Sequence, residues 1–138
     1  METNFVSEEF VKEYFADKYQ NTRIKNAKIE YADVILFRGF LAFDLEFTYG
    51  VGCQGYMSPA LTGNTKDGWS DKGSGNFIGN ILELLGDYDS NERIRTKSLK
   101  GLPCRVFSND CGVYAIGNFL EDKWFIPEYY YEKLKENE

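Results

Sequence analysis

The stretch Gly73-Ser-Gly-Asn-Phe-Ile-Gly-Asn-Ile-Leu-Glu-Leu-Leu-Gly86 predicts the central helix of the fold. Its apolar residues recur at helical spacing and form one face, which consists of Phe77, Ile78, Ile81, Leu82 and Leu85. Burying such side chains stabilises a fold by about 1.5–3 kcal/mol each, before conformational entropy is subtracted. Gly86 is typical of the residue that ends a helix in the left-handed conformation. We therefore expect a helix over residues 73–86 that lies on a sheet.

The clearest strand is residues 40–49, in which apolar and polar residues alternate. Asp44, Glu46 and Thr48 share one face, and the apolar side chains share the other. One buried face and one solvated face are typical of an antiparallel sheet. The same reasoning predicts a strand over residues 24–37, which a turn at Arg38 and Gly39 joins to residues 40–49. It also predicts strands over residues 50–57, 102–107 and 113–116, and a last strand or packed segment around Trp124.

The whole chain of 138 residues is expected to form one domain of the α+β class. The N-terminal segment, residues 1–22, is expected to carry a helix over residues 7–19 with Ser7 as its cap. The C-terminal segment, residues 128–138, is expected to form a helix with an acidic tail. Residues 23–127 form a β-rich core. We expect a twisted antiparallel sheet of five or six strands, with the central helix packed across it and short helices at the ends of the chain.

Three glycines, Gly50, Gly52 and Gly55, interrupt the strand expected over residues 50–57. A glycine inside a strand indicates a bulge, a tight bend or the close approach of a ligand or another backbone. These interpretations stay open at the level of the sequence.

The composition excludes several classes of function. A formal net charge of −6 argues against direct nucleic-acid binding, which needs a surplus of positive charge. The chain has no histidine, which removes His-dependent catalysis and His metal sites. Asp44 and Glu46 share a strand face, but nothing in the sequence indicates the buried setting of an acid–base pair. We expect no catalytic residue, no cofactor and no metal; an enzyme that works through carboxylates or a cysteine remains an alternative.

The sequence also bears on location and assembly. It contains no recognisable signal peptide and no apolar run long enough to span a membrane, so we expect a cytoplasmic protein without membrane contact. Cys53, Cys104 and Cys111 lack zinc-site spacing and are expected to be free thiols in a reducing compartment. Aromatic residues make up 17% of the chain, and covering them favours a homo-oligomer.

The start of the central helix predicts an anion site. Its glycine-rich residues would offer backbone N–H groups at the positive end of the helix, although they match neither a phosphate-binding P-loop nor the dinucleotide fingerprint. A basic run follows the helix, with no acidic residue between Glu92 and Asp110, and Phe77 would offer a stacking face. The candidate ligand-binding residues are Gly73, Ser74, Gly75, Asn76, Phe77, Arg93, Arg95, Lys97 and Arg105. Two other interpretations stay open: that the glycines serve close packing of the helix, and that the basic run is a solvated face.

Several stretches between Ile24 and Phe125 resemble a group of small phage-encoded accessory proteins. They are Ile24-Lys-Asn-Ala-Lys-Ile29, Gly50-Val-Gly-Cys-Gln-Gly-Tyr56, the helix from Phe77 to Leu85, Leu99-Lys-Gly-Leu-Pro-Cys-Arg-Val106, Tyr114-Ala-Ile-Gly-Asn-Phe119 and Lys123-Trp-Phe125. Some of these proteins look like counter-defence factors. The nearest functional type is the anti-Thoeris type, which sequesters a cyclic ADP-ribose-like signal. The resemblance implies action in the cytoplasm of the host cell, and it transfers no ligand-binding residue to this chain.

Two functions follow as expectations. The first is a counter-defence protein that sequesters a small nucleotide-derived anionic signal without turnover. The alternative is an acidic protein-binding inhibitor, similar to an anti-CRISPR protein, that blocks the nucleic-acid-binding groove of a host defence enzyme. In that alternative Asp44, Glu46 and the Glu-rich C-terminal tail form the acidic surface.

Overall fold

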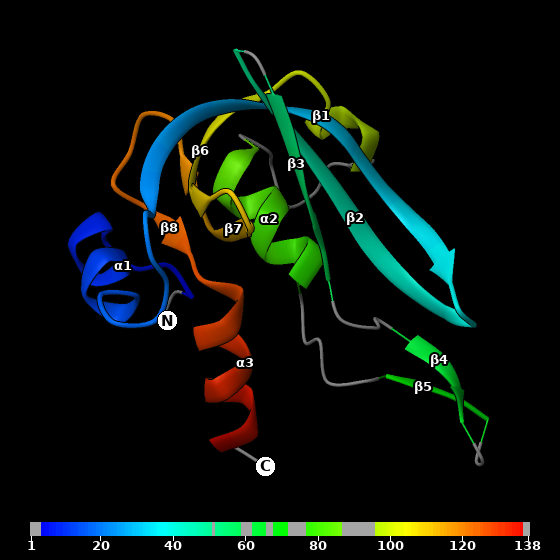
Figure 1. The fold of residues 1–138 in the computed structure, drawn as a ribbon. Helices are drawn as coiled ribbons and strands as arrows, with labels where there is room; N and C mark the ends of the chain where they lie inside the picture. Colours follow the sequence, from blue (N-terminus) through cyan, green and yellow to red (C-terminus); the bar gives the residue numbers. More distant parts are fainter. Residues whose placement is uncertain are drawn as a thin grey trace.

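The computed structural model describes residues 4–50, 52–58, 62–65, 68–71, 77–86 and 96–136. Figure 1 shows the arrangement of the elements. In chain order they are α1 (Glu8–Tyr14), β1 (Arg23–Phe37), β2 (Phe40–Tyr49), β3 (Gly52–Met57), β4 (Thr62–Thr65), β5 (Gly68–Asp71), α2 (Phe77–Leu85), the 3-10 helix η1 (Thr96–Leu99), β6 (Pro103–Asn109), β7 (Gly112–Asn118), β8 (Trp124–Phe125) and α3 (Pro127–Glu136).

The strands of the described residues form a single antiparallel sheet in the order β5-β4-β2-β1-β6-β7-β8, with β3 beside β2. The predicted α+β class, with an antiparallel sheet and a central helix across it, is confirmed. The sheet has eight strands in this part of the chain rather than five or six. Two of the additional strands are β4 and β5, which form a short hairpin where polar residues and turn signals predict a loop.

Strand β1 joins the two halves of the sheet. Its first part, from Arg23 to Lys28, pairs with β6, and its second part, from Lys28 onward, pairs with β2. The register shifts between Ile29 and Tyr31, so a bulge lies just beyond the change of partner. Figure 1 shows β1 arching over α2. The predicted strand over residues 24–37 corresponds to β1, and the pairing with β2 continues without a break through residues 31–37.

Helix α2 lies on the inner, concave face of the sheet and forms the main core with it (Figure 1). Phe77, Ile81 and Leu84 are buried there, and the apolar face of β2 is buried against them. The helical prediction is therefore confirmed from Phe77 to Leu85, while residues 73–76 lie outside the described residues. Leu84 is fully buried, whereas Ile78, Leu82 and Leu85 are only partly buried, so the buried face is rotated from the predicted one.

Helix α1 covers the outer face of the sheet over β6, β7 and β8. Ser7 caps it as predicted, because its hydroxyl accepts a hydrogen bond from the Phe10 backbone N–H at 3.1 Å. The helix ends at Tyr14, before its predicted end at residue 19, and Phe15 turns inward to stack on Phe107 with ring centroids 5.5 Å apart. A second buried cluster results, on the opposite side of the sheet from α2.

The hairpin between β1 and β2 turns at Arg38 and Gly39, as the sequence predicts. Both residues have positive φ angles, 51° and 86°. That combination is typical of the tight turn whose twist matches the strands it joins.

Candidate functional site

The nine residues of the predicted anion site do not form a described cluster. Six of them lie outside the described residues, so the prediction stays untested there: Gly73, Ser74, Gly75, Asn76, Arg93 and Arg95. Of the other three, Lys97 is exposed on η1, Phe77 belongs to the inner core, and Arg105 contacts the outer cluster.

Phe77 does not offer a stacking face, and that part of the prediction is wrong. Its side chain is fully buried. The ring stacks on Tyr56 at a centroid distance of 5.7 Å and meets the rings of Phe43 and Phe125 edge-on. Because aromatic neighbours surround the ring on several sides, it contributes to the core rather than to a ligand site.

The guanidinium of Arg105 binds other groups of the protein, so it is not free to bind a phosphate as predicted. It donates hydrogen bonds to the backbone oxygens of Asn118 (2.8 Å) and Glu121 (2.9 Å) and forms an ion pair with Glu8 at 3.2 Å. The guanidinium also lies 5.0 Å from the centroid of the Trp124 ring. Arg105 therefore ties the start of α1 to the loop that follows β7.

A pocket of about 460 Å³ opens where β1 changes its pairing partner. Lys28 lies opposite Thr48 of β2 and also opposite Pro103 of β6. Before Lys28, β1 pairs only with β6, and β2 ends one residue after Thr48, so the strands part here. The lining residues are Asn26, Ala27, Lys28, Thr48, Tyr49, Gly50, Pro103 and Phe119.

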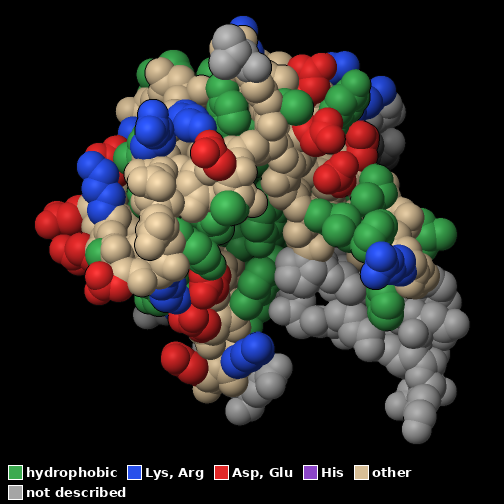
Figure 2. Space-filling model, in the orientation of Figure 1, with side chains coloured by type: hydrophobic (Ala, Val, Ile, Leu, Met, Phe, Trp, Pro, Cys, Tyr) green, Lys and Arg blue, Asp and Glu red, His purple; other side chains and the backbone are tan. Residues whose placement is uncertain are grey.

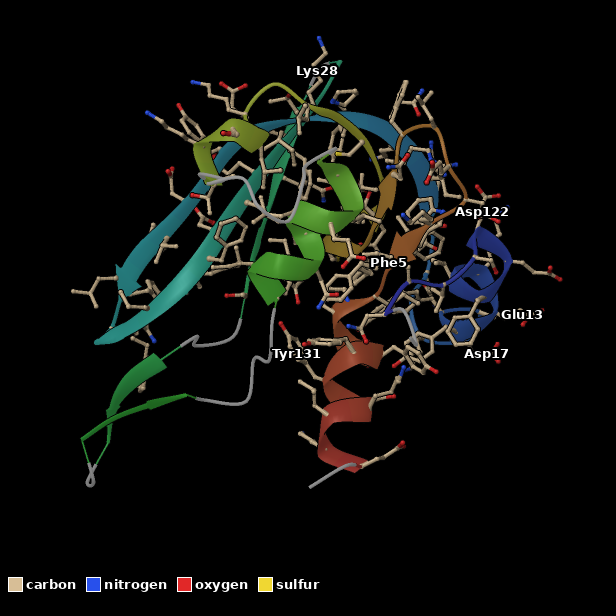
Figure 3. The ribbon with its side chains drawn as sticks, turned by 180° about the vertical axis from the view of Figure 1, so that it is seen from behind. Phe5, Glu13, Asp17, Lys28, Asp122 and Tyr131 are labelled. Carbon is tan, nitrogen blue, oxygen red and sulfur yellow. The ribbon has the colours of Figure 1, made fainter. Side chains whose placement is uncertain are left out.

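The pocket combines a cation, polar side chains and an aromatic ring. Lys28 is exposed and projects from the crest of the arched strand (Figure 3), and it forms no ion pair with any other described residue. Asn26 and Thr48 lie on the same sheet face as Lys28, because neighbouring residues on a strand alternate sides and cross-strand partners share one. Phe119 is 41% exposed at the pocket wall.

Gly50 adds bare backbone to the wall of the pocket. A Cβ atom built at Gly50 would meet no protein atom within 4 Å, so the backbone is open to an approaching ligand. Of the sequence interpretations for the glycines of residues 50–57, a bulge is wrong for residues 52–57, because β3 pairs with β2 there in unbroken register. The bulge lies in β1 instead.

Sequence reasoning missed Lys28, Asn26 and Phe119 as site residues. Lys28 and Asn26 look like ordinary solvent-facing residues of an alternating strand, and nothing local distinguishes them. The usable signal was Gly50, a glycine at the end of a clear strand.

The described residues hold no group of three or more acidic or cysteine side chains that could bind a metal ion. No helix of the described chain is long and apolar enough to cross a membrane. Comparison of the chain with protein-family models, with curated proteins and with solved structures gives no match in any of the three. The function is therefore inferred from the geometry of the pocket.

Proposed function

We propose that the protein is a non-catalytic binding protein that sequesters a small nucleotide-derived anion in the pocket at Lys28. The observation that carries the proposal is the meeting of Lys28, Thr48 and Phe119 in one pocket of about 460 Å³. Pockets of about 300–1,000 Å³ are the usual size for small-molecule sites.

Each part of the pocket matches one part of such a ligand. The Lys28 ammonium attracts a phosphate, and the hydroxyl of Thr48 and the amide of Asn26 donate hydrogen bonds to its oxygens. The partly exposed ring of Phe119 offers a face to a base, and base stacking on aromatic rings contributes about 1–3 kcal/mol. Bare backbone at Gly50 lets the ligand approach closely.

The chemistry of the lining favours binding over turnover. Among the described residues, the eight that line the pocket include no carboxylate and no thiol, the groups on which a chain without histidine would most readily rely for catalysis. A sequestering protein needs only affinity and a supply of protein that matches the amount of signal.

The biological setting rests on the resemblance to small phage accessory proteins. A phage protein that holds a cyclic ADP-ribose-like signal would deprive a host defence enzyme of its activator. Counter-defence by sequestration is therefore the role that we propose for this chain, in the cytoplasm of the host.

The proposal is tested by calorimetric titration with cyclic ADP-ribose, its isomers, linear ADP-ribose and cyclic dinucleotides. We expect saturable binding of at least one member of this panel, and mass spectrometry after heat denaturation should recover that compound unchanged. A chemically altered product would identify an enzyme instead. Failure of every member to bind would contradict the proposal.

A further inference from the structure

The outer face of the sheet is covered unevenly. Helix α1 packs over β6, β7 and β8, whereas the 3-10 helix η1, which contacts β1, buries its Leu99 in the inner core. The cross-strand register shows which residues share the outer side of β1, β2 and β3, a surface that we call the outer hairpin face. They are Tyr31, Asp33, Ile35 and Phe37 from β1, Asp44 and Glu46 from β2, and Met57 from β3.

Large apolar side chains are exposed on the outer hairpin face. Tyr31 is 46% exposed, Phe37 is 44% exposed and Met57 is 41% exposed. Single exposed apolar residues are ordinary, but a group of them on one sheet face, from β1 and β3 on either side of β2, is typical of an interaction surface. Aromatic residues and methionine are also the apolar types enriched in protein interfaces.

Three carboxylates lie among these apolar side chains. Asp33 is directly opposite Asp44, and Glu46 is two residues further along β2 on the same face. Like charges directly opposite each other destabilise a sheet, so folding alone does not favour this arrangement. None of the three forms an ion pair with another described residue. In Figure 2 acidic side chains gather over the part of the molecule where Figure 1 has β1 and β2.

Three cations lie on or beside this face, and none forms an ion pair with Asp33, Asp44 or Glu46. Lys28 is diagonal to Glu46 on the same sheet face. Lys100 lies over the Tyr31 ring, with its ammonium 5.4 Å from the centroid, and Arg38 lies 5.2 Å from the Phe37 centroid. Both contacts are with aromatic rings rather than with carboxylates. The outer hairpin face thus combines unpaired negative charge with unburied apolar area.

We propose that the outer hairpin face docks a basic protein surface, in which lysine or arginine side chains alternate with apolar ones. Charge complementarity identifies this occupant, because Asp33, Asp44 and Glu46 attract a cationic surface and repel nucleic acid. A second copy of this chain fits poorly, since a twofold contact through the face would bring the same carboxylates together. No residue of the outer hairpin face lines the pocket at Lys28, and the proposal does not depend on the sequestering function.

The test uses the full-length protein labelled with ¹⁵N and titrated with a short peptide in which lysine or arginine alternates with leucine and tryptophan. We expect saturable shifts of the amide signals of residues 31–37, 40–46 and 52–57, and affinity that falls as salt is added. The triple variant Asp33→Asn/Asp44→Asn/Glu46→Gln should bind the peptide about tenfold more weakly. It should fold at least as well as the wild type, because the variant removes the repulsion between Asp33 and Asp44.

A matched control removes the same number of negative charges from α1 and the turn that follows it. Glu13 and Asp17 point to solvent on that side of the molecule (Figure 3), and the control is Glu9→Gln/Glu13→Gln/Asp17→Asn. We expect it to bind the peptide within about twofold of the wild type. Equal losses in the two triple variants, shifts confined to other elements, or no saturable binding would overturn the proposal. So would a dimer, detected by sedimentation, that the Asp33, Asp44 and Glu46 substitutions alter.

Discussion

Lys28 on β1 lies directly opposite Thr48 on β2, at the point where these two strands begin to pair. One residue therefore marks both the change of pairing partner along β1 and the opening of the pocket. Because the strands part on the N-terminal side of this pair, polar side chains and bare backbone gather where a continuous sheet would leave no space. The proposed site is thus a consequence of the strand pairing.

A side chain added to the wall of the pocket should fill part of the space for the ligand and weaken binding. Gly50 lines the pocket, and a Cβ there would meet no protein atom, so Gly50→Val is expected to fold normally. The added isopropyl group takes up ligand space, and we expect binding of the nucleotide that the wild type sequesters to weaken by about tenfold or more. Calorimetry measures the affinity, and circular dichroism checks the fold.

Gly52→Val is the matched control, because Gly52 also has open space around it and does not line the pocket. It should bind like the wild type. Equal loss in both variants would remove Gly50 from the site.

Gly117 is required by the packing of Trp124. A Cβ at Gly117 would lie 2.7 Å from the indole ring, a distance at which the buried ring must move. Gly117→Ala should therefore lower the free energy of unfolding by about 1–3 kcal/mol in urea titrations. Gly112→Ala, which adds only an ordinary contact with Tyr114 at 3.8 Å, should change it far less. A Gly117→Ala protein as stable as the wild type would show that the ring is not held against the strand.

Arg105 should matter for stability. Arg105→Ala removes the ion pair with Glu8 and two hydrogen bonds to backbone oxygens, and we expect a loss of about 1–3 kcal/mol in the free energy of unfolding. Lys12→Ala removes an exposed pair with the same glutamate and should cost no more than about 0.5 kcal/mol. Denaturant titration of both variants checks the difference. Comparable losses would mean that the Arg105 contacts contribute little.

Alkaline pH should destabilise the protein through its buried thiol. Burial raises the pKa of Cys104 from its ordinary value of 9.0 to about 12. The unfolded chain loses this proton first, so the stabilising contribution is complete below about pH 9 and is lost as the pH rises toward 12. Burial also raises the pKa of Tyr56 to about 12, which acts in the same direction.

Unfolding titrations across this pH range should show stability falling less steeply for Cys104→Ala than for Cys111→Ala. Thiol labelling of the native protein near pH 8 should modify the exposed Cys53 and Cys111 and leave Cys104 unmodified until the protein unfolds. Rapid labelling of Cys104 in the native state would contradict its burial.

The elements with strong local patterns could be predicted from the sequence. The alternation of residues 40–49 predicted β2 with its correct bounds, and the helical spacing after Phe77 predicted α2. Long-range pairing was not predictable in the same way. The change of pairing partner along β1, from β6 to β2 at Lys28, depends on strands from distant parts of the chain, which no local propensity records.

The candidate site was harder to predict than the fold, because its residues come from four separate segments of the chain. Arg105 stood out in a basic run, yet the ion pair with Glu8 joins residues that lie far apart in the sequence. Lys28 carried no local signal, and only the change of strand pairing gives it a place beside Phe119. A prediction from charge runs favours conspicuous residues over residues that the topology brings together.

The most direct test of the central claim compares the dissociation constant of the sequestered nucleotide between two variants, Lys28→Met and Lys97→Met. Lys97 is also an exposed lysine but lies on η1, away from the pocket lining, and belongs to the anion site predicted from the sequence. We predict that calorimetry will show binding weakened by about tenfold for Lys28→Met, with Lys97→Met within about twofold of the wild type. Unchanged affinity in Lys28→Met, above all with affinity lost in Lys97→Met, would contradict the site at Lys28.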